Sequence, residues 1–481
     1  MQSLRNIKII ATLGPVSFSE DVIRDLHEKG ADLFRINMSH TSHDVMRDLI
    51  RKIRTVELKY RRPIGILIDL QGPKFRVGKF VASRAVLEPG QVFVLDSNSA
   101  LGNANRVFLP HPEVFKSIRE GDRILIDDGK LTLCVQEKGE DFIKCKVVSG
   151  ESISDCKGIS FPDTFLTSQV LTEKDRADLN AALETAEVDW IALSFIQSPD
   201  DLLEIRKIIP QDRGVGLMAK IEKSQAIECI EEIIQLSDAV MVARGDLGVE
   251  MPLDSVPGIQ KRLIRIARQL GRPVVIATQM LESMISSPVP TRAEVSDVAN
   301  AVFEEADAIM LSAETASGSY PVEAVKIMAL VASSAERDPS WSEMRSLRKI
   351  KPNATGADVI SSAARQIAET LCLSAIVCYT SSGATGLRAA RERSQIVILA
   401  LSPILQTARR LSLVWGLRCV VTEDACDFDD MINRACRIVV EEGLGNPGDR
   451  IIVSAGLPAG TPGSTNMLRI AYIGSDGLSG V

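Results

Sequence analysis

The stretch VGLMAKIEKSQAIECIEEIIQLSDAVMVARGDLGVE, from Val215 to Glu250, decides the fold. It contains two short apolar runs, one ending in AKIE and the other in ARGD, with a helix-like stretch between them. Short runs that are continuously apolar are typical of parallel strands covered on both faces. A strand, a helix and a second strand in this order predict a βα unit.

Runs of the same kind recur along the chain, with helical stretches between them. Including those two, there are eight: IKIIAT from Ile7, ADLFRIN from Ala31, IGILID from Ile64, DWIALSF from Asp189, GVGLMAKIE, DAVMVARGD, PVVIATQ from Pro273 and DAIMLSAET from Asp307. Eight βα units predict a closed (β/α)8 barrel, or TIM barrel. The pattern by itself leaves an open, doubly wound sheet as the alternative.

The alternation is interrupted after the third run. Turn-punctuated β runs, such as RILIDDGKLTLCVQEKGEDFIKCKVV from Arg123, predict a small β-barrel domain inserted into a βα loop, in the position of a lid. A polar linker at Lys351-Pro352-Asn353 precedes a further α/β alternation. We therefore predict barrel segments at residues 1–71 and 166–345, an inserted β-domain at 72–165 and a C-terminal α/β domain at 346–481.

The composition is that of an ordinary globular protein, with 45% apolar and 25% charged residues among 481. The chain has 56 Lys and Arg against 63 Asp and Glu, a net charge of −7 with no dense block of either sign. We therefore expect small-molecule partners and no nucleic acid. No apolar run approaches the roughly 18 residues that a membrane span needs, so we expect no membrane partner either.

The numbers and positions of cysteine and histidine limit the catalytic mechanisms that the chain can use. Nine Cys without a C-x-x-C pair fit reduced thiols and a cytoplasmic location better than a disulfide framework. All four His lie in the first quarter of the chain, so the later domains cannot supply one for a Cys/His or Ser/His/Asp arrangement. Catalysis is therefore expected to depend on Lys, Arg and carboxylates.

Polar residues stand where the predicted strands end, which is where (β/α)8 barrels build their active sites. Lys220 and Glu222 are two positions apart on one run, so their side chains leave the same face and can converge on one ligand. A single charged residue at a strand end is merely solvated about as often as it is functional, but a whole ring of polar residues at the strand ends indicates a site. The ring comprises Arg35, Asn37, Asp69, Lys220, Glu222, Arg244, Asp246, Thr278 and Glu314.

Asp246 follows the run after that of Glu222, so the two can share a cation. Two carboxylates favour Mg²⁺ or Mn²⁺ over Zn²⁺. Backbone N–H groups at Gly245 and Asp246 can bind a substrate carboxylate if they open a helical turn. Arg244-Gly245-Asp246 also resembles an adhesion tripeptide, which the end of a buried strand would not display.

Two stretches are candidates for phosphate binding, and the chain has no G-x-x-x-x-G-K-[ST] loop. GLGNPG from Gly443 follows a helix-like stretch and precedes a strand, the reverse of a dinucleotide site, so we interpret it as a helix stop and turn. The segment Thr380-Ser381-Ser382-Gly383-Ala384-Thr385 lies between a predicted strand and a predicted helix, where hydroxyl and N–H groups can face one phosphate. Ser and Thr that only cap this helix are an equal alternative.

Eight segments together resemble the successive signatures of the pyruvate kinase family: IKIIATLGPVS, FRINMSH, DLQGPKFR, MAKIE, MVARGDLGVE, ATQMLESM, PTRAEVSDVANAV and MLSAETASGSYP. They follow the family's order from Ile7 to Met328, and GLPAGTPGSTN near the C-terminus resembles its effector domain. The resemblance implies a TIM barrel with an inserted β-domain lid and a C-terminal α/β domain. It also implies Mg²⁺-dependent transfer of a phosphoryl group from phosphoenolpyruvate to ADP, giving ATP and pyruvate as the last step of glycolysis, by a homotetramer.

The resemblance also assigns roles to residues. Lys220 and Arg35 match the cations that face the transferring phosphoryl group, and Thr278 matches the threonine beside the reacting carbon. Glu222 and Asp246 match the divalent-metal ligands. Phosphoenolpyruvate would bind to Arg35, Lys220, Gly245, Asp246 and Thr278, and ADP or ATP to His40 and Arg76. A phosphorylated activator would bind in the C-terminal domain, at Thr380, Ser381, Ser382, Gly383 and Thr385.

The chain departs from the family at Asp69-Leu70-Gln71-Gly72-Pro73-Lys74, where many members have Asp-Thr-Lys-Gly-Pro-Glu. Members with Glu at the position of Lys74 use K⁺, held by groups that match Asn37, Ser39, Asp69 and the Leu70 carbonyl. We expect the Lys74 ammonium to replace the ion, so that K⁺ is not required. The alternative is that Lys74 points into solvent and the cation site still works.

Two further departures are Ala313, where Gly is common, and Gln197, where Arg is common. Neither removes a charged group assigned to the chemistry. A barrel lyase or aldolase that handles a metal enolate of pyruvate, without a lid or nucleotide, remains an alternative, as does a catalytically silent metabolite sensor. Silence is disfavoured because such a site need not keep the three converging charges of Lys220, Glu222 and Asp246.

Overall fold

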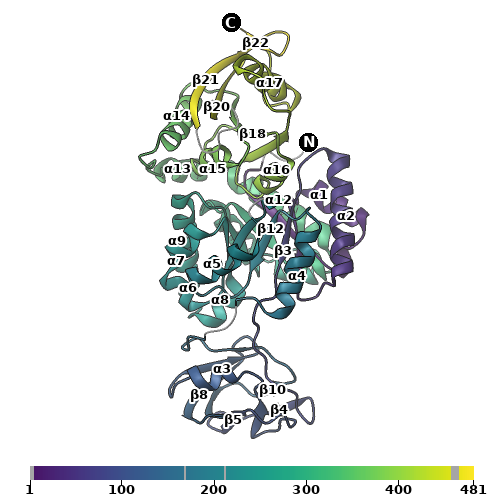
Figure 1. Ribbon diagram of the computed structural model, residues 1–481, viewed down its shortest axis with the longest axis vertical. Helices are drawn as coiled ribbons and strands as arrows, with labels where there is room; N and C mark the ends of the chain where they lie inside the picture. Colours follow the sequence, from purple (N-terminus) through teal and green to yellow (C-terminus); the bar gives the residue numbers. More distant parts are fainter. Residues whose placement is uncertain (1–4, 167–169, 211–212, 457–464, 481) are drawn as a thin grey trace.

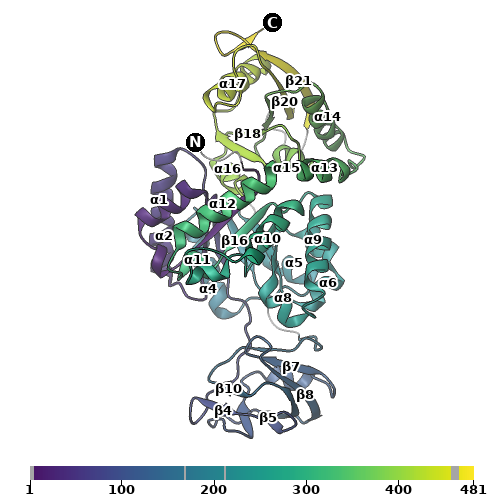
Figure 2. The same cartoon turned by 180° about the vertical axis from the view of Figure 1, so that it is seen from behind.

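The computed structural model describes residues 5–166, 170–210, 213–456 and 465–480. Three bodies lie in a row, with a barrel in the middle, a β-domain at one end of it and the C-terminal domain at the other (Figure 1). The view from behind shows the same order (Figure 2). The β-domain and the C-terminal domain therefore face opposite ends of the barrel.

Eight parallel strands close the barrel, in the order β1-β16-β15-β14-β13-β12-β3-β2. The prediction of a closed barrel is confirmed, and the open-sheet alternative is wrong. Each of the eight apolar runs corresponds to one strand. The strands are β1 (Lys8–Leu13), β2 (Leu33–Asn37), β3 (Gly65–Asp69), β12 (Trp190–Leu193), β13 (Gly216–Ile221), β14 (Ala239–Ala243), β15 (Val274–Ala277) and β16 (Ala308–Leu311).

Nearly every residue of these strands is buried, because side chains fill the barrel and helices cover its outside. Leu67, Met218 and Met310 belong to the cluster that fills the interior. The helical elements around it are η1 (Pro15–Ser17), α1 (Glu20–Lys29), α2 (His43–Tyr60), α4 (Glu173–Glu184), α5 (Pro199–Ile208), α6 (Ser224–Glu228), α7 (Ile230–Leu236), α8 (Arg244–Glu250), α9 (Val256–Leu270), η3 (Glu282–Ile285), α10 (Arg292–Phe303), α11 (Ala313–Ala316) and α12 (Pro321–Arg337).

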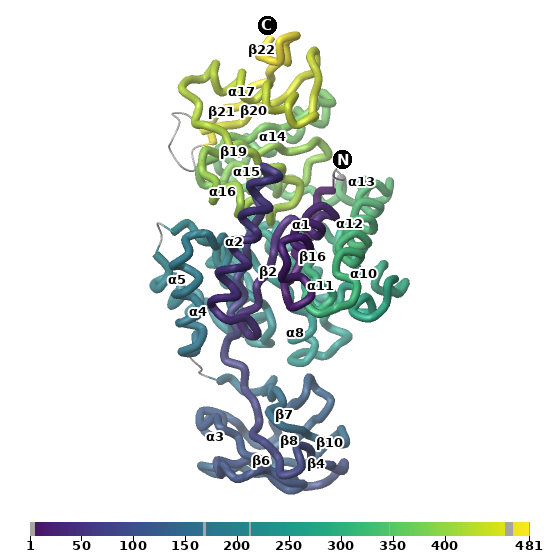
Figure 3. The backbone as a smooth tube through the Cα atoms, turned by 90° about the vertical axis from the view of Figure 1, so that its right-hand side faces the viewer, coloured from purple at the N-terminus to yellow at the C-terminus, as the bar shows by residue number. Residues whose placement is uncertain are grey.

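The inserted β-domain leaves the barrel after β3, as the side view shows (Figure 3). Its strands form a six-stranded sheet, β11-β7-β8-β9-β5-β6, and a two-stranded sheet, β10-β4, around one core that includes Phe93 and Phe161. The predicted tight turn at Asp128-Gly129 is present between β7 and β8, with φ of 56° and 83°. The elements are β4 (Arg84–Val86), β5 (Val92–Asp96), β6 (Arg106–Phe108), α3 (Pro112–Ser117), β7 (Arg123–Ile126), β8 (Leu131–Lys138), β9 (Phe142–Ser149), β10 (Ser152–Ser154) and β11 (Ile159–Ser160).

The C-terminal domain has a mixed sheet in the order β19-β18-β17-β20-β21-β22, in which β21 and β22 are antiparallel to their neighbours. GLGNPG follows a helix and precedes a strand, which confirms its interpretation as a stop and turn. Helix α13 (Pro339–Leu347) leads from the barrel into this domain, and its Trp341 packs in the barrel core. The elements of the domain are α14 (Gly356–Thr370), β17 (Ala375–Tyr379), α15 (Ala384–Arg391), β18 (Ile398–Ser402), α16 (Leu405–Leu411), β19 (Leu417–Val421), α17 (Phe428–Glu441), β20 (Arg450–Gly456), β21 (Thr465–Ile473) and β22 (Ser479–Gly480).

The C-terminal domain covers the amino ends of the barrel strands. Leu413, just after α16, belongs to the cluster inside the barrel. Trp415 donates its backbone N–H to Asp307, the residue before β16, at 3.1 Å. The carboxyl ends of the strands therefore lie at the opposite end, toward the β-domain. We retain 71/72, 165/166 and 345/346 as proposed domain limits.

Candidate active site

Lys220 lies at the centre of a buried ionic cluster at the carboxyl ends of the strands. Its ammonium is 2.9 Å from a carboxylate oxygen of Glu222 and 3.3 Å from one of Asp69. Both carboxylate side chains are only 1% exposed. The predicted convergence of Lys220 and Glu222 is therefore present, with Asp69 of β3 as a third member.

Arg35 of β2 joins the cluster from the other side of Asp69. Its Nε donates to Asp69 Oδ2 at 2.7 Å, and a terminal nitrogen donates to Thr12 Oγ1 at 3.1 Å. Asp69 thus holds both cations, Arg35 and Lys220, at fixed positions on adjacent sides. Two adjacent cations repel one another, and an anion between them or in front of them offsets this repulsion.

The ionisation of the cluster follows from these contacts. Burial opposes the charge of Lys220, but Asp69 and Glu222 outweigh it and raise the pKa of the ammonium. Burial likewise opposes ionisation of Asp69, but Lys220 and Arg35 outweigh it and lower the pKa of the carboxyl. For Glu222, burial prevails and, with Asp246 adding repulsion, raises the pKa despite Lys220.

Asp246 faces Glu222 from the first turn of α8. The cleft that both line also contains Phe195 and Lys223 from the barrel and Lys74 from the inserted segment. Within the described part of the chain, no hydrogen bond reaches the Asp246 carboxylate. Its oxygens are therefore available to a ligand in the cleft.

A divalent cation fits this pair by charge and by donor type. Lys220 and Arg35 carry two positive charges, whereas Asp69, Glu222 and Asp246 carry three negative ones, so the site has a net charge of 2 − 3 = −1. An anionic substrate would be repelled unless positive charge were added. Carboxylate oxygens are the donors that Mg²⁺ and Mn²⁺ prefer. No group of three or more His, Cys, Asp and Glu that could hold a metal occurs among the described residues. Mg²⁺ bound by one or two carboxylates usually keeps water or substrate oxygens as its other ligands.

Thr278 follows β15 with an unusual backbone, φ of 69°. Its Oγ1 accepts from the Gly245 N–H at 2.8 Å and donates to the Ala277 carbonyl at 2.6 Å. Gly245 and Asp246 do open a helical turn, as the anion-site hypothesis required, but this N–H is already bonded to Thr278. Arg244 turns away from the cluster and pairs with Asp297 at 2.7 Å.

Two residues of the site were not singled out from the sequence. Ser194 and Phe195 follow β12, and both contact the ionic cluster: Lys220 donates to Ser194 Oγ at 2.7 Å, and the Phe195 N–H donates to Glu222 at 2.7 Å. The signal that could have found them is their position, because they follow an apolar run just as Asp69 and Thr278 do. Neither side chain carries charge, so neither stood out.

The predicted cation ligands lie at the edge of the cluster. The Asn37 side chain accepts from the Ser39 N–H at 3.1 Å, and the Leu70 carbonyl accepts from the Ser194 hydroxyl at 2.8 Å. Lys74 is exposed and lines the cleft with Glu222 and Asp246 rather than extending away from it.

The predicted nucleotide contacts come from two different domains, and neither lines the cleft. His40 is exposed on the loop after β2. Arg76 is exposed in the inserted segment, where its guanidinium donates to the Cys156 carbonyl at 2.9 Å. Glu314, another member of the strand-end ring, does not join the cluster, because its carboxylate accepts from the backbone N–H groups of Leu281 and Ser312.

Comparisons with known proteins decide the family. Residues 4–325 match the family model described as the pyruvate kinase barrel domain, and residues 358–471 match the pyruvate kinase alpha/beta domain. The chain belongs to the pyruvate kinase family. It is 53% identical to a pyruvate kinase of Methylorubrum extorquens over 473 residues, 98% of each chain, and 43% identical to one of Agrobacterium vitis over 98% of this chain and all of the other. A crystal structure of a pyruvate kinase from Cryptosporidium parvum superposes with a TM-score of 0.90 at 31% identity, covering 98% of this chain and 96% of that one.

Membership of the pyruvate kinase family makes the chain a phosphotransferase and confirms the resemblance stated from its motifs. The pyruvate kinase family also implies dependence on a divalent metal, which agrees with the charge of the site. No helix of the described ranges is both long and apolar enough to cross a membrane.

The predicted effector loop of this pyruvate kinase family member lies between β17 and α15. Thr380 Oγ1 accepts from the Gly383 N–H at 2.9 Å, and Ser382 Oγ accepts from the Ala384 N–H at 3.4 Å. Thr385 Oγ1 is paired with Thr465 Oγ1 at 2.9 Å, and Ser381 donates no hydrogen bond within the described residues. Exposed Ser382 keeps its hydroxyl at the surface. Residues 457–464 of the GLPAGTPGSTN segment fall outside the described residues.

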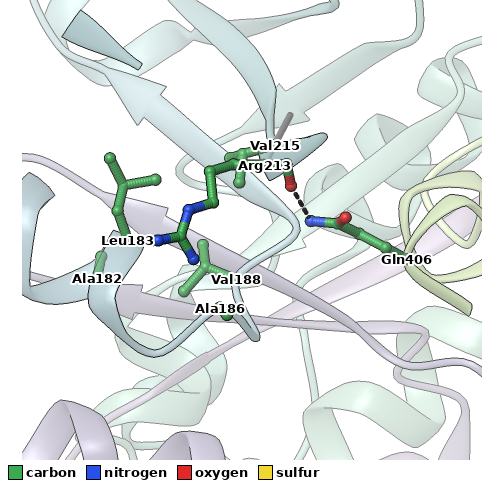
Figure 4. Close-up of a pocket in the computed structure, with 7 residues that line it drawn as sticks. All are labelled: Ala182, Leu183, Ala186, Val188, Arg213, Val215 and Gln406. Carbon is green, nitrogen blue, oxygen red and sulfur yellow. Dashed lines mark hydrogen bonds between the residues drawn. The ribbon is translucent and has the colours of Figure 1, made fainter. Parts of the chain in front are cut away.

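A further pocket, of about 290 Å³, lies between the barrel and the C-terminal domain (Figure 4). Gln406 of α16 donates from its side chain to the Arg213 carbonyl there. None of the predicted site residues contributes to it. The lining residues are Ala182, Leu183, Ala186, Val188, Arg213, Val215 and Gln406.

Proposed function

We propose that the chain catalyses phosphoryl transfer from phosphoenolpyruvate to ADP at the carboxyl ends of the barrel strands, as the last step of glycolysis in the cytoplasm. The observation that carries the proposal is the cluster of Lys220, Arg35 and three carboxylates, which family membership alone does not specify. In this cluster the three carboxylates outnumber the two cations, and Glu222 and Asp246 line the cleft.

Lys220 and Arg35 stabilise the phosphoryl group in transit. In the reaction, the bond between phosphorus and the enol oxygen breaks, and a bond to a terminal oxygen of ADP forms. Negative charge spreads over the phosphoryl oxygens in the transition state, and fixed cations stabilise it most where water is excluded. The raised pKa of Lys220 keeps its ammonium charged throughout.

Glu222 and Asp246 would hold Mg²⁺ or Mn²⁺. When bound, this ion supplies positive charge beside the enolate oxygen and the phosphoryl group. The two carboxylates enter from neighbouring loops, after β13 and at the start of α8, so they fix the position of the donor oxygens from two directions.

Thr278 and Gly245 would position the substrate. The hydrogen bond from the Gly245 N–H to Thr278 Oγ1 holds Thr278 against Gly245, the residue before Asp246 of the cleft. After transfer, the enolate takes a proton at its terminal carbon to give pyruvate, and Thr278 would orient that carbon. His40 and Arg76 would contact ADP, one from the barrel and one from the inserted domain.

Lys74 would make K⁺ unnecessary. An ammonium about 6 Å from the phosphoryl group contributes roughly 3 kcal/mol at an effective dielectric constant near 20, which is comparable with a bound monovalent ion. Its place in the cleft beside Glu222 and Asp246 supports this role. Asn37, Ser39, Asp69 and the Leu70 carbonyl are the groups that would otherwise hold the ion.

The C-terminal domain would bind a phosphorylated activator at the loop from Thr380 to Thr385, in a homotetramer. The exposed hydroxyl of Ser382 and the turn at Gly383, with φ of 92°, support a phosphate at this loop. Thr380 and Thr385 are buried, whereas Ser381 is half-buried and Ser382 exposed, so the two serines would make the main side-chain contacts.

The proposed activity is tested by measuring pyruvate and ATP formed from phosphoenolpyruvate and ADP, with Mg²⁺ and with Mg²⁺ removed by a chelator. We expect equal amounts of both products, and none without the metal. Pyruvate released without ADP would instead indicate a lyase or phosphatase. No product under any condition would contradict a catalytic role.

A further inference from the structure

Ser194 links the reacting end of Lys220 to the backbone of β3. Its Oγ accepts from the Lys220 ammonium at 2.7 Å and donates to the Leu70 carbonyl at 2.8 Å. The residue is 5% exposed, so water does not compete for these bonds. Asp69 and Glu222 attract the ammonium without fixing its direction, because ion pairing depends weakly on angle, whereas the hydroxyl offers one directed acceptor.

Phe195 fixes the orientation of the Glu222 carboxylate in a corresponding way. Its N–H donates to Glu222 Oε2 at 2.7 Å, while the other carboxylate oxygen pairs with Lys220. The N–H can point there because Phe195 has a left-handed backbone, with φ of 60°. A bulky residue rarely adopts this conformation, and such outliers gather at functional sites.

Gly72 packs against this dipeptide at the point where the inserted domain begins. A Cβ at Gly72 would lie 2.9 Å from both Ser194 Cβ and a ring carbon of Phe195. The Gly72 N–H donates to Asp175 Oδ1 of α4 at 3.1 Å, so Gly72 is itself held against the barrel. Gly72 therefore keeps Ser194 and Phe195 from moving away from the cluster.

We propose that Ser194 and Phe195 are positioning residues of the reaction: Ser194 aims the Lys220 ammonium at the phosphoryl group, and the Phe195 N–H turns Glu222 toward Asp246. This inference rests on the proposed roles of Lys220 and Glu222. Neither residue touches the reacting atoms. Each sets the direction of a group that does.

The role of Ser194 is tested with Ser194→Ala and Ser194→Cys. Both remove the strong directed acceptor, and cysteine keeps the shape. We expect kcat to fall about 10- to 100-fold in both, with the KM for phosphoenolpyruvate within about threefold of the parent, because the charge of Lys220 remains but its direction is lost. Ser237→Ala is the matched control, since Ser237 is a fully buried serine of the barrel domain whose hydroxyl donates to the Ile233 carbonyl at 2.7 Å.

A merely structural role would lower the unfolding temperature and leave kcat per folded molecule unchanged. Ser194→Ala with kcat within twofold of the parent, or a control with the same loss, would overturn the role of Ser194. A parent that forms no pyruvate from phosphoenolpyruvate and ADP would refute the proposed function instead, so the two failures are distinguishable.

The role of Phe195 is tested by comparing Phe195→Ala with Phe195→Gly. Both lose the ring, but only glycine occupies the left-handed region without strain and so keeps the N–H aimed at Glu222. We expect the Mg²⁺ concentration for half-maximal rate to rise about fivefold or more for alanine and less for glycine. Equal values, or the reverse order, would overturn the role of Phe195.

Discussion

Both ends of the barrel bury charged residues, but they do so in different ways. At the amino ends, Asp307 accepts from Arg393 at 3.0 Å and from the Val274 N–H at 3.1 Å, and the C-terminal domain covers the pair. At the carboxyl ends, Lys220 lies between two carboxylates, and Asp246 beside them accepts no hydrogen bond from the described residues.

The difference shows that a buried charge at a strand end is not by itself a sign of function. The amino-end carboxylates are matched by cations, as Asp307 is by Arg393 and Asp189 by Arg54. Leu413 and Trp415 close off this end. The carboxyl-end charges are unequal in number and face a cleft that a separate domain borders. A cluster in which carboxylates outnumber cations and that borders a cleft is the distinguishing feature.

The largest expected effect comes from Lys220→Met at the carboxyl end. It removes a charge needed mainly in the transition state, so kcat should fall roughly 10³-fold or more. Thermal unfolding should show that the fold is retained. Near-normal turnover would contradict the placement of the active site at this end.

The corresponding substitution at the amino end is Arg393→Met, which should lower stability rather than kcat. It leaves the buried Asp307 without its cation and removes the guanidinium from its place 4.9 Å from the Trp415 ring centre. We expect a loss of about 3–5 kcal/mol in stability, measured by denaturant or thermal unfolding. The activity of the molecules that remain folded should stay within twofold. A loss of kcat in Arg393→Met without a loss of stability would contradict the claim that the amino-end charges are structural.

A smaller effect is expected for Lys74→Glu at the carboxyl end, whose initial rate K⁺ should raise about a hundredfold. The parent should keep near-full activity in potassium-free buffer with a bulky organic counter-ion, and Lys74→Glu should acquire K⁺ dependence. Initial rates with and without added K⁺ measure both. A parent that K⁺ stimulates a hundredfold would show that Lys74 does not replace the ion.

Asp246→Asn should raise the Mg²⁺ requirement about tenfold, because an amide is a weaker ligand than a carboxylate. A Mg²⁺ titration of the initial rate measures this. Asp297→Asn is a suitable control, since Asp297 pairs with Arg244 outside the cluster. An unchanged titration for Asp246→Asn would remove that residue from the metal site.

The smallest effect is expected in the C-terminal domain. Ser382→Asp should repel a phosphorylated activator and abolish a stimulation of several fold, while activity without activator stays as in the parent. Thr407 and Arg410 of α16 donate to the Ser381 and Ser382 carbonyls, so this loop contacts the helix that covers the amino ends. Stimulation by sugar phosphates and nucleoside monophosphates that survives the change would leave the loop as a helix cap.

Much of the site could be predicted from the sequence. The apolar runs fix where each strand ends, and Arg35, Asp69, Lys220 and Thr278 stand at those ends. Ser194 and Phe195 also follow an apolar run, but they do not stand out there, because an uncharged hydroxyl and a backbone N–H carry no compositional signal. Their importance depends on the left-handed backbone at Phe195 and on contacts with strands distant in sequence.

The sequence by itself determined which residues gather at each end of the barrel, because the period and length of the apolar runs set the strand limits locally. It places Asp189 and Asp307 just before their strands, Asp69 at the end of one and Asp246 after another, but it does not show which of them a cation will match. Only the tertiary structure decided that Arg54 and Arg393 would match the first two, that Asp69 would pair with Lys220, and that Asp246 would line a cleft. Charge pairing depends on distances of a few ångströms between different strands, and those distances exist only once the barrel has closed.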